Sequence, residues 1–363
     1  MPARAALRRA PHRALYLPNT AHRCCCSSQA GVGPLSVNDP STTVLGFPQW
    51  QGAGLENAER YQLGGPMLHR SVCALLPRAK QCVVHVAPDE PGPAARLNQV
   101  DEWWGQTVIE RQQAQARALL SEMASTRVVA VGGDCGIEPA IVGFLTEKYG
   151  GDLAVLWLDA HADLNEPQHS PSGLFHGMAL RACLEPVLFG GTMACQTVPQ
   201  PVSHAHVVLA GTRSLDQPER SYLAEHNMSY LPPGCLEHSG NGSDHARSAL
   251  LDALARTSAN NLYVHIDLDV VDPSHLPHVG VPEPDGISPG ALLQLIAQVA
   301  KQWRGSNGAS KVVGLSVTEF APQSQSTPVQ QHATIAFVTK LVEELFRGRE
   351  DDRVHSLSAT SSW

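Results

Sequence analysis

From about residue 82 onward, short runs of β-branched and apolar residues alternate with longer segments whose apolar residues recur at helical spacing. This alternation constrains the fold more than any other feature, because it is typical of βαβ units around a parallel sheet. We expect strands at residues 82–86, 128–132, 154–159, 206–211, 262–267 and 311–317. The pattern therefore predicts an α/β protein.

Two of the intervening segments carry clear helix signals. Ser288 is a favourable N-cap, and Pro289 suits the first helical position. The apolar residues that follow recur every three or four positions: Leu292, Leu295, Ile296, Val299, Ala300 and Trp303. A second stripe lies within residues 332–346. Such stripes pack into a core, so we interpret both as core helices. The glycine-rich polar stretches at residues 190–200 and 234–245 are expected to be surface loops.

Composition excludes several classes of function. The formal charge of −8 disfavours a nucleic-acid partner, whose phosphates need a basic face. No apolar run approaches the roughly 18 residues that span a bilayer, so no membrane role is expected. The nine cysteines include no C-x-x-C pair, which predicts neither a disulfide framework nor a zinc knuckle. A reducing, cytoplasmic compartment is the simpler interpretation.

The two ends of the chain differ from its middle. Residues 1–38 contain five arginines and no acid. That bias is shared by organellar (mitochondrial) transit segments, whereas their prolines favour an unstructured tail, and both interpretations stay open. Residues 349–363 are charged and serine-rich, which predicts a C-terminal tail. One large domain is expected between them, at residues 39–348.

Three of the expected strands end in clusters of acids with histidine or cysteine. They are Asp134-Cys135, Asp159-Ala-His161-Ala-Asp163 and Asp267-Leu-Asp269. Ligands of an open parallel sheet bind beyond the carboxyl ends of its strands, so the clusters should converge. Alternate residues of an extended segment also point to one side. Each cluster can therefore face a single point.

The negative charge of so many neighbouring acids needs positive charge to balance it. Buried carboxylates repel one another and lose hydration unless cations neutralise them. Four carboxylates and one imidazole, with a thiol nearby, form an oxygen-rich set that suits Mn²⁺ better than a structural Zn²⁺ site. The alternative is that each acid caps a strand end or forms a salt bridge. Two clusters behind buried apolar strands favour bound metal.

The order of these motifs resembles that of the arginases, agmatinases and related ureohydrolases. The resemblance rests on Gly132-Gly133-Asp134-Cys135, Asp159-Ala-His161-Ala-Asp163, Ser172-Gly-Leu-Phe-His176-Gly177, Asp267-Leu-Asp269-Val-Val-Asp272-Pro and Gly314-Leu-Ser-Val-Thr-Glu319. It covers about residues 45–346. It implies a three-layer, arginase-like α/β fold with a central, mostly parallel sheet and helices on both faces. Residues 39–348 would be the ureohydrolase catalytic domain.

By this resemblance, two Mn²⁺ ions would be bound by one set of side chains. The set is Cys135, Asp159, His161, Asp163, Asp267 and Asp269. The family usually has histidine at the position of Cys135. A thiolate favours softer ions, so Zn²⁺, Fe²⁺ or Ni²⁺ become alternatives to Mn²⁺. A Cys135 that only packs in the core is a further alternative.

The resemblance also assigns catalytic roles. His176 matches the family's proton-shuttling histidine, and Glu319 matches the acid that pairs with the substrate guanidinium. Asp163 is expected to pass a proton to the departing amine. The nucleophile would be a metal-bridging hydroxide, and the products would be urea and an amine.

Three polar residues match the positions at which the family's arginine hydrolases bind the substrate's α-carboxylate and α-amino groups. They are Asn165, Ser172 and Asp216. Leu174 stands where a second carboxylate-binding asparagine would be expected. The resemblance therefore implies a small guanidino substrate of arginine metabolism without fixing its identity.

Two rival functions remain. A single-zinc deacetylase on a related scaffold would carry an adjacent His-His pair, and the sequence has none. A catalytically silent, arginase-like structural or regulatory subunit is the other, and Cys135 and Leu174 are the residues that favour it. The resemblance further implies a homo-oligomer, either a trimer or a hexamer.

Overall fold

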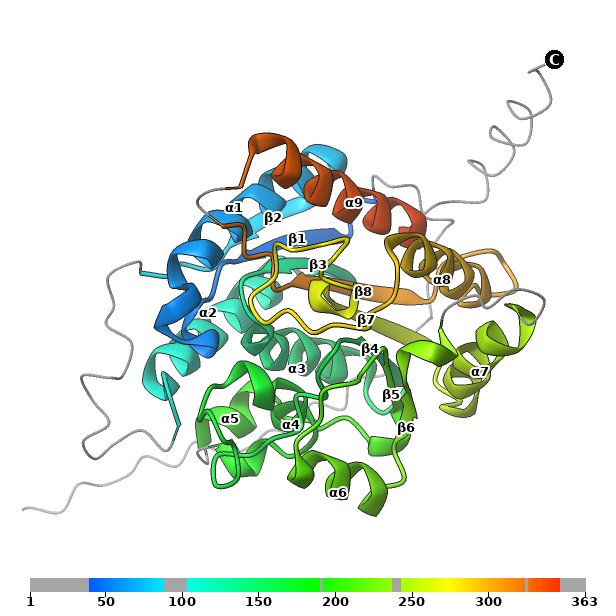
Figure 1. Ribbon diagram of the computed structural model, residues 1–363, viewed down its shortest axis with the longest axis horizontal. Helices are drawn as coiled ribbons and strands as arrows, with labels where there is room; N and C mark the ends of the chain where they lie inside the picture. Colours follow the sequence, from blue (N-terminus) through cyan, green and yellow to red (C-terminus); the bar gives the residue numbers. More distant parts are fainter. Residues whose placement is uncertain (1–38, 88–102, 190–191, 237–242, 324–325, 347–363) are drawn as a thin grey trace, which may run out of the picture. The chain divides into compact units, whose positions relative to one another are not determined.

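Parallel strands form the centre of the fold in the computed structural model, which describes residues 39–87, 103–189, 192–236, 243–323 and 326–346 (Figure 1). The strands are β1 (Thr42–Phe47), β2 (Lys80–Val83), β3 (Arg127–Gly132), β4 (Leu153–Leu158), β5 (Val207–Ala210), β6 (Ser229–Leu231), β7 (Asn261–Asp267) and β8 (Val312–Thr318). They form one sheet in the order β2-β1-β3-β8-β7-β4-β5-β6. Every pairing in it is parallel.

Helices cover both faces of this sheet (Figure 1). They are α1 (Ala58–Leu75), α2 (Gln106–Glu122), α3 (Glu138–Tyr149), α4 (Ala179–Leu184), α5 (Thr192–Thr197), α6 (Gln217–Glu225), α7 (Ser243–Arg256), α8 (Pro289–Gln302) and α9 (Pro328–Phe346). One hydrophobic core unites α1, α7, α8 and α9 with one face of the strands, and a second unites α2, α3, α4 and α6 with the other. The predicted three-layer α/β fold is confirmed.

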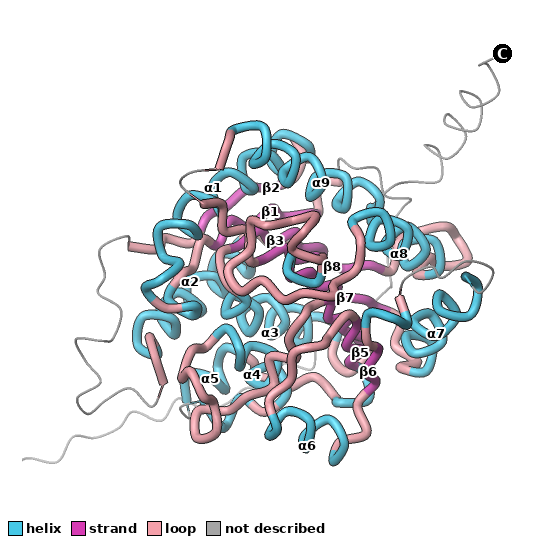
Figure 2. The backbone as a smooth tube through the Cα atoms, in the orientation of Figure 1, coloured by secondary structure: helices cyan, strands magenta, loops and turns pink. Residues whose placement is uncertain are grey.

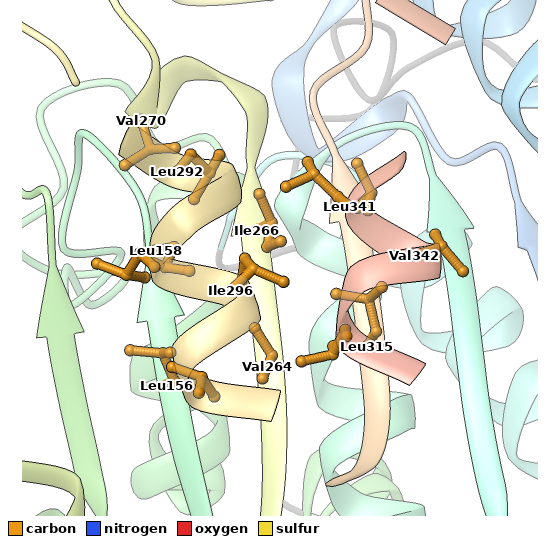
Figure 3. Close-up of a cluster of buried hydrophobic side chains, with 14 of the residues drawn as sticks. Leu156, Leu158, Val264, Ile266, Val270, Leu292, Ile296, Leu315, Leu341 and Val342 are labelled. Carbon is orange, nitrogen blue, oxygen red and sulfur yellow. The ribbon is translucent and has the colours of Figure 1, made fainter. Parts of the chain in front are cut away.

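The alternation of side chains along the strands explains why two cores exist. In β7, Val264 and Ile266 pack under α8 and α9, whereas Tyr263 points into the opposite core. Figure 3 shows Leu292 and Ile296 of α8 and Leu341 and Val342 of α9 packed over β4, β7 and β8. A strand buried on both faces reads as a continuous apolar run, which is why these strands were visible in the sequence.

Most of the expected elements are present, with some corrections. The five expected strands from residue 128 onward match β3, β4, β5, β7 and β8, and residues 82–86 overlap only the end of β2. The N-cap prediction is confirmed, since Ser288 Oγ accepts a hydrogen bond from Ala291 N at 3.2 Å. The C-terminal helix begins at Pro328, four residues before the predicted start.

The prediction of surface loops at residues 190–200 and 234–245 is wrong in part. The first stretch contains α5, and α7 begins inside the second, at Ser243. Leu250, Ala253 and Leu254 of α7 lie in the core, whereas the sequence at the beginning of the helix is polar and resembled a loop. Both predicted tails lie outside the described residues, and the domain boundaries at residues 39 and 348 stay a prediction.

The connections beyond the carboxyl ends of the strands shape the candidate site. The segments that follow β4 and β7 are largely loop before α4 and α8 begin (Figure 2). A short 3₁₀ turn follows β3 at Cys135–Ile137, and another follows β7 at Leu268–Val270. Among the described helices, none is both long and apolar enough to cross a membrane.

The contrast between buried and exposed positions of α9 predicts a difference in stability. Val338 is 0% exposed and Val329 is 78% exposed, so Val338→Ala should lower the free energy of unfolding by about 2 kcal/mol. Val329→Ala is the matched control and should stay within about 0.5 kcal/mol of wild type. Urea denaturation measures both, and equal effects would contradict the packing of α9 on the sheet.

Candidate active site

Strands β3, β4, β7 and β8 bring polar side chains to one cavity of about 300 Å³ at the carboxyl edge of the sheet. Ten of the eleven predicted site residues line it: Cys135, His161, Asp163, Asn165, Ser172, His176, Asp216, Asp267, Asp269 and Glu319. The eleventh, Asp159, is wholly buried, and its Oδ1 accepts a hydrogen bond from His161 N at 2.7 Å. The predicted residues therefore share one site, while their roles stay predictions.

Backbone amides fix the direction of the acids. Asp267 Oδ1 accepts from Asp269 N at 2.7 Å, and Asp134 Oδ1 accepts from Gly136 N at 2.8 Å, which repeats the arrangement at Asp159. Such bonds to the amide two residues ahead form where a strand turns into a loop. Glycine is required at Gly133, because a Cβ there would lie 1.6 Å from Gln49 O.

Two site residues have a backbone conformation that is uncommon for a side-chain-bearing residue. Asp163 has φ +53° and Glu319 has φ +65°. Left-handed backbone at such residues costs on the order of 1 kcal/mol or more and tends to occur at functional sites. Within the described residues, Oδ2 of Asp163 is also buried without a hydrogen-bond partner. A buried carboxylate oxygen without a protein partner is suited to binding a cation.

The acids are short of positive charge. Burial, and then the charge of Asp159, raises the pKa of Asp163 well above its usual value. Burial and Asp269 do the same to the pKa of Asp267. For His161, burial lowers the pKa, but Asp269 and Asp159 outweigh it and raise the pKa far above the ordinary value. These surroundings favour the protonated forms of Asp163 and Asp267, whereas a bound divalent cation would favour their ionised forms.

The donor atoms are close enough to hold metal. One donor atom from each of Asp159, His161 and Asp269 lies within 4.8 Å of the others, and Cys135, Asp267 and Glu319 form a second such group. Together with the unpaired oxygen of Asp163, these carboxylates, imidazole and thiol fit a divalent cation.

Cys135 lies in the middle of the buried polar groups. Its Sγ is 3.1 Å from Asp267 Oδ2, 3.2 Å from Thr318 Oγ1 and 3.6 Å from His265 Nε2. Burial, and then the charge of Asp267, raises the pKa of the thiol well above its ordinary value. Without a cation the thiol therefore stays protonated and donates to Asp267.

Glu319 is held from three sides at the end of β8. Its Oε1 accepts from Cys135 N at 3.2 Å and lies 3.5 Å from His176 Nδ1, while Oε2 accepts from the hydroxyl of Tyr61. Burial lowers the pKa of His176, but Glu319 raises it above the usual value. These contacts point Glu319 into the cavity beside His176.

The outer wall of the cavity carries the residues predicted to bind substrate. Asn165 Nδ2 donates to Asp216 Oδ2 at 2.9 Å, and Asp216 N donates to Glu219 Oε2 at 2.8 Å. Within the described part of the chain, Asn165 Oδ1 is buried without a hydrogen-bond partner. Ser172 and Leu174 also line the cavity. A polar acceptor is therefore available to a ligand that reaches this wall.

Sequence reasoning missed several residues of the site. They are His265, Glu138, Tyr61 and Glu219. His265 had a signal, because a polar residue two positions before Asp267 must point to the same side of a buried strand. Tyr61 had none, since it comes from α1, far from Glu319 in sequence.

The sheet order and the acidic cavity at its carboxyl edge define a three-layer α/β protein of the arginase-like class. The sequence model of the Arginase family matches residues 67–347, which is most of the chain. The chain belongs to the arginase family.

Individual relatives agree with this assignment. The arginase of Bacillus subtilis (strain 168) is 33% identical over 162 residues, which cover 44% of this chain and 52% of that protein. The chain thus spans about half the length of the curated relatives it matches. The structure of Entamoeba histolytica arginase in complex with L-ornithine superposes with a TM-score of 0.68 at 19% identity, covering 85% of this chain and 99% of that one. The structure of agmatine ureohydrolase of Thermoplasma volcanium superposes with a TM-score of 0.59 at 14% sequence identity. The match covers 89% of this chain and 96% of that one.

The close approach of Gly280 to this site predicts a sensitive position. A Cβ at Gly280 would lie 1.8 Å from Tyr61 Oη and 2.5 Å from Glu319 Oε2, and both residues are buried. We expect Gly280→Ala to lower stability by about 1–3 kcal/mol through overpacking. Gly290→Ala is the control, since nothing lies within 4 Å of its Cβ position. Thermal unfolding compares the two, and an unchanged Gly280→Ala protein would contradict the contact.

Proposed function

We propose that this protein hydrolyses a guanidino or amidino C–N bond of a small cationic substrate, releasing urea and an amine in the manner of an arginase or agmatinase. Membership of the arginase family supports the reaction class. The observation that carries the proposal is the convergence of four buried carboxylates, an imidazole and a thiol on one cavity that also contains Glu319. The proposed cofactors are two divalent cations, and Mn²⁺ is the first candidate.

The proposed ligands are Cys135, Asp159, His161, Asp163, Asp267 and Asp269. Divalent cations bound there would supply Lewis acidity, which makes water a nucleophile near neutral pH. Asp159, Asp267 and Asp269 are already oriented by backbone amides, so little side-chain entropy is lost when they bind metal. The elevated pKa values of the acids would fall when metal binds, and protons would be released.

The remaining side chains bind and orient the substrate. Glu319 has two carboxylate oxygens near the cavity, and a carboxylate can accept two parallel N–H bonds from a guanidinium. His176, 3.5 Å from Glu319, could deliver a proton to a departing nitrogen or exchange one with solvent. Asp163 would be a second proton carrier, because its Oδ2 has no hydrogen-bond partner among the described residues.

The substrate class follows from the cavity. About 300 Å³ accommodates a small molecule, and Asn165, Ser172 and Asp216 offer hydrogen bonds to a polar tail. Leu174 adds an apolar side chain to the lining of the cavity, so the tail need not be that of L-arginine. The relatives are named as an arginase and an agmatine ureohydrolase, which are enzymes for different guanidino compounds.

A urea-release screen tests the proposal. Metal-free protein would be loaded with Mn²⁺, Ni²⁺, Zn²⁺ or Fe²⁺ and incubated with L-arginine, agmatine and shorter guanidino acids. We expect turnover of at least one compound with one metal. Metal uptake without turnover of any compound, or the absence of uptake, would favour the silent subunit.

Replacing the central acid Asp267 should abolish the rise in melting temperature that Mn²⁺ causes. Asp267→Asn removes a buried charge from the ligand set, so Mn²⁺ should no longer raise the melting temperature. A ligand of the folded state present at 100 times its Kd stabilises wild type by about 2.7 kcal/mol. Asp272→Asn is the control, because Asp272 lies five residues further along and does not line the cavity. An undiminished metal response in Asp267→Asn would refute its role as a ligand.

His176 should affect turnover and leave metal content unchanged. Removing a general acid or base lowers kcat by roughly 10²- to 10⁴-fold, so we expect His176→Ala to lose activity in that range. Elemental analysis should find the wild-type amount of metal. His169→Ala supplies the control, since the His169 side chain is 58% exposed and lies outside the cavity. Loss of metal from His176→Ala would instead make His176 a ligand.

A further inference from the structure

A buried histidine that none of the sequence motifs includes lies beside Cys135. His265 is in β7, two residues before Asp267, and is 0% exposed. Alternate strand residues point to one side, and both side chains reach the same thiol. His265 Nε2 is 3.6 Å from Cys135 Sγ, and Asp267 Oδ2 is 3.1 Å from it. An imidazole is therefore present next to the position where a thiol replaces the expected histidine.

The imidazole ring of His265 is fixed by its neighbours. It stacks on Trp157 with ring centroids 3.8 Å apart and an interplanar angle of 28°. Its Nδ1 lies 3.0 Å from Ser316 Oγ and 3.1 Å from Oε1 of the buried Glu138. The other oxygen of Glu138 accepts a hydrogen bond from Tyr263 Oη at 2.6 Å. Ring rotation would therefore break contacts on several sides.

This environment resembles that of metal-binding histidines. A ligating imidazole usually donates its second ring N–H to a carboxylate, which fixes the tautomer and increases the basicity of the ligating nitrogen. A proton on Nδ1 can be donated to Ser316 Oγ at 3.0 Å, with Glu138 Oε1 3.1 Å away, and the lone pair of Nε2 then faces Cys135 and Asp159. Nε2 lies 3.9 Å from Asp159 Oδ2, and one donor from each of the three residues falls within 4.8 Å of the others.

We propose that His265, Cys135 and Asp159 form a ligand set for a thiophilic divalent cation, Zn²⁺ or Fe²⁺. His265 thereby supplies the imidazole that Cys135 does not. Thiolate and imidazole favour these ions, whereas carboxylates favour Mn²⁺. All three side chains are buried, so a cation there is shielded from solvent and its attraction to the ligands is strong.

The site would therefore bind two different metals that share Asp159. Its Oδ2 faces His265, while its Oδ1 lies 3.5 Å from His161 Nδ1 in the group that also contains Asp269. This pairing of an oxygen-rich group with a sulfur-containing group rests on the proposed function, because that proposal supplies the first metal. The sulfur-containing group can be tested independently of catalysis.

The competing interpretation needs no metal at this position. His265 could carry a proton and neutralise Glu138 and Asp159 as a buried imidazolium. In that case His265 would have no effect on metal affinity. The two interpretations therefore differ in a binding measurement.

The test uses the metal-free full chain titrated with Zn²⁺, Co²⁺ and Mn²⁺. Co²⁺ reports a thiolate ligand through a charge-transfer absorption band. We expect this band in wild type and its loss in Cys135→Ser. We expect His265→Asn to raise the Kd for Zn²⁺ at least about tenfold, because it removes a ligand, while the Kd for Mn²⁺ stays the same.

Tyr263→Phe is the matched control for His265→Asn. Tyr263 lies on the same strand and also contacts Glu138, but it is not part of the metal-competent group. Its Zn²⁺ affinity should stay closer to wild type than that of His265→Asn. If His265→Asn fails to fold, as judged by circular dichroism, Cys135→His provides the second test. It restores an imidazole and should raise affinity for Mn²⁺ relative to Zn²⁺.

The outcomes separate this inference from the proposed function. Urea release with Mn²⁺ alone, together with unchanged Zn²⁺ affinity in His265→Asn and no cobalt–thiolate band, overturns the inference and leaves the hydrolase intact. Zn²⁺ binding that depends on His265 and Cys135, without turnover of any guanidino compound, supports the inference and refutes the hydrolase. Wild-type protein that binds none of the three ions overturns both.

Discussion

Mutual repulsion among buried carboxylates is the constraint on which this structure depends. Asp159, Asp163, Asp267 and Asp269 are at most 4% exposed and line or border one cavity. Burial and neighbouring charges raise the pKa of three of them, which means that the fold alone does not stabilise their ionised forms. Such an arrangement lowers the free energy of unfolding of the metal-free protein. The burial of apolar side chains in the two cores on either face of the parallel sheet offsets this loss.

The sheet also explains why much of the fold was predictable. Central parallel strands are buried on both faces, so β3, β4, β7 and β8 appear as apolar runs. The two edge strands of the sheet, β2 and β6, were harder to predict. β6 has only three residues, none of them buried, and β2 is largely exposed, so neither carries a hydrophobic pattern. β1 is buried but lies apart from the regular alternation, and its pairing with β3 joins residues far apart in sequence.

The candidate site was predictable where its residues follow strands and not where they come from elsewhere. Strand ends of a parallel sheet meet at one edge, so the acids could be grouped from the sequence alone. The contact between Tyr61 and Glu319 joins α1 to β8, and no local pattern reports such a pairing. His265 was overlooked because it lies inside an otherwise apolar strand, where its alternation with Asp267 was visible but not used.

The carboxylate of Asp159 lies between the imidazoles of His161 and His265. Its pKa is the exception among the four acids: burial raises it, but the nearby imidazoles of His161 and His265 outweigh burial and lower it. Each imidazole faces a different oxygen of the same carboxylate. The ionised Asp159 is thus stabilised from both sides before any cation arrives, whereas Asp163 and Asp267 are not. Cation binding at the proposed metal site would not need to deprotonate Asp159, and the negative charge of Asp159 would already attract the cation.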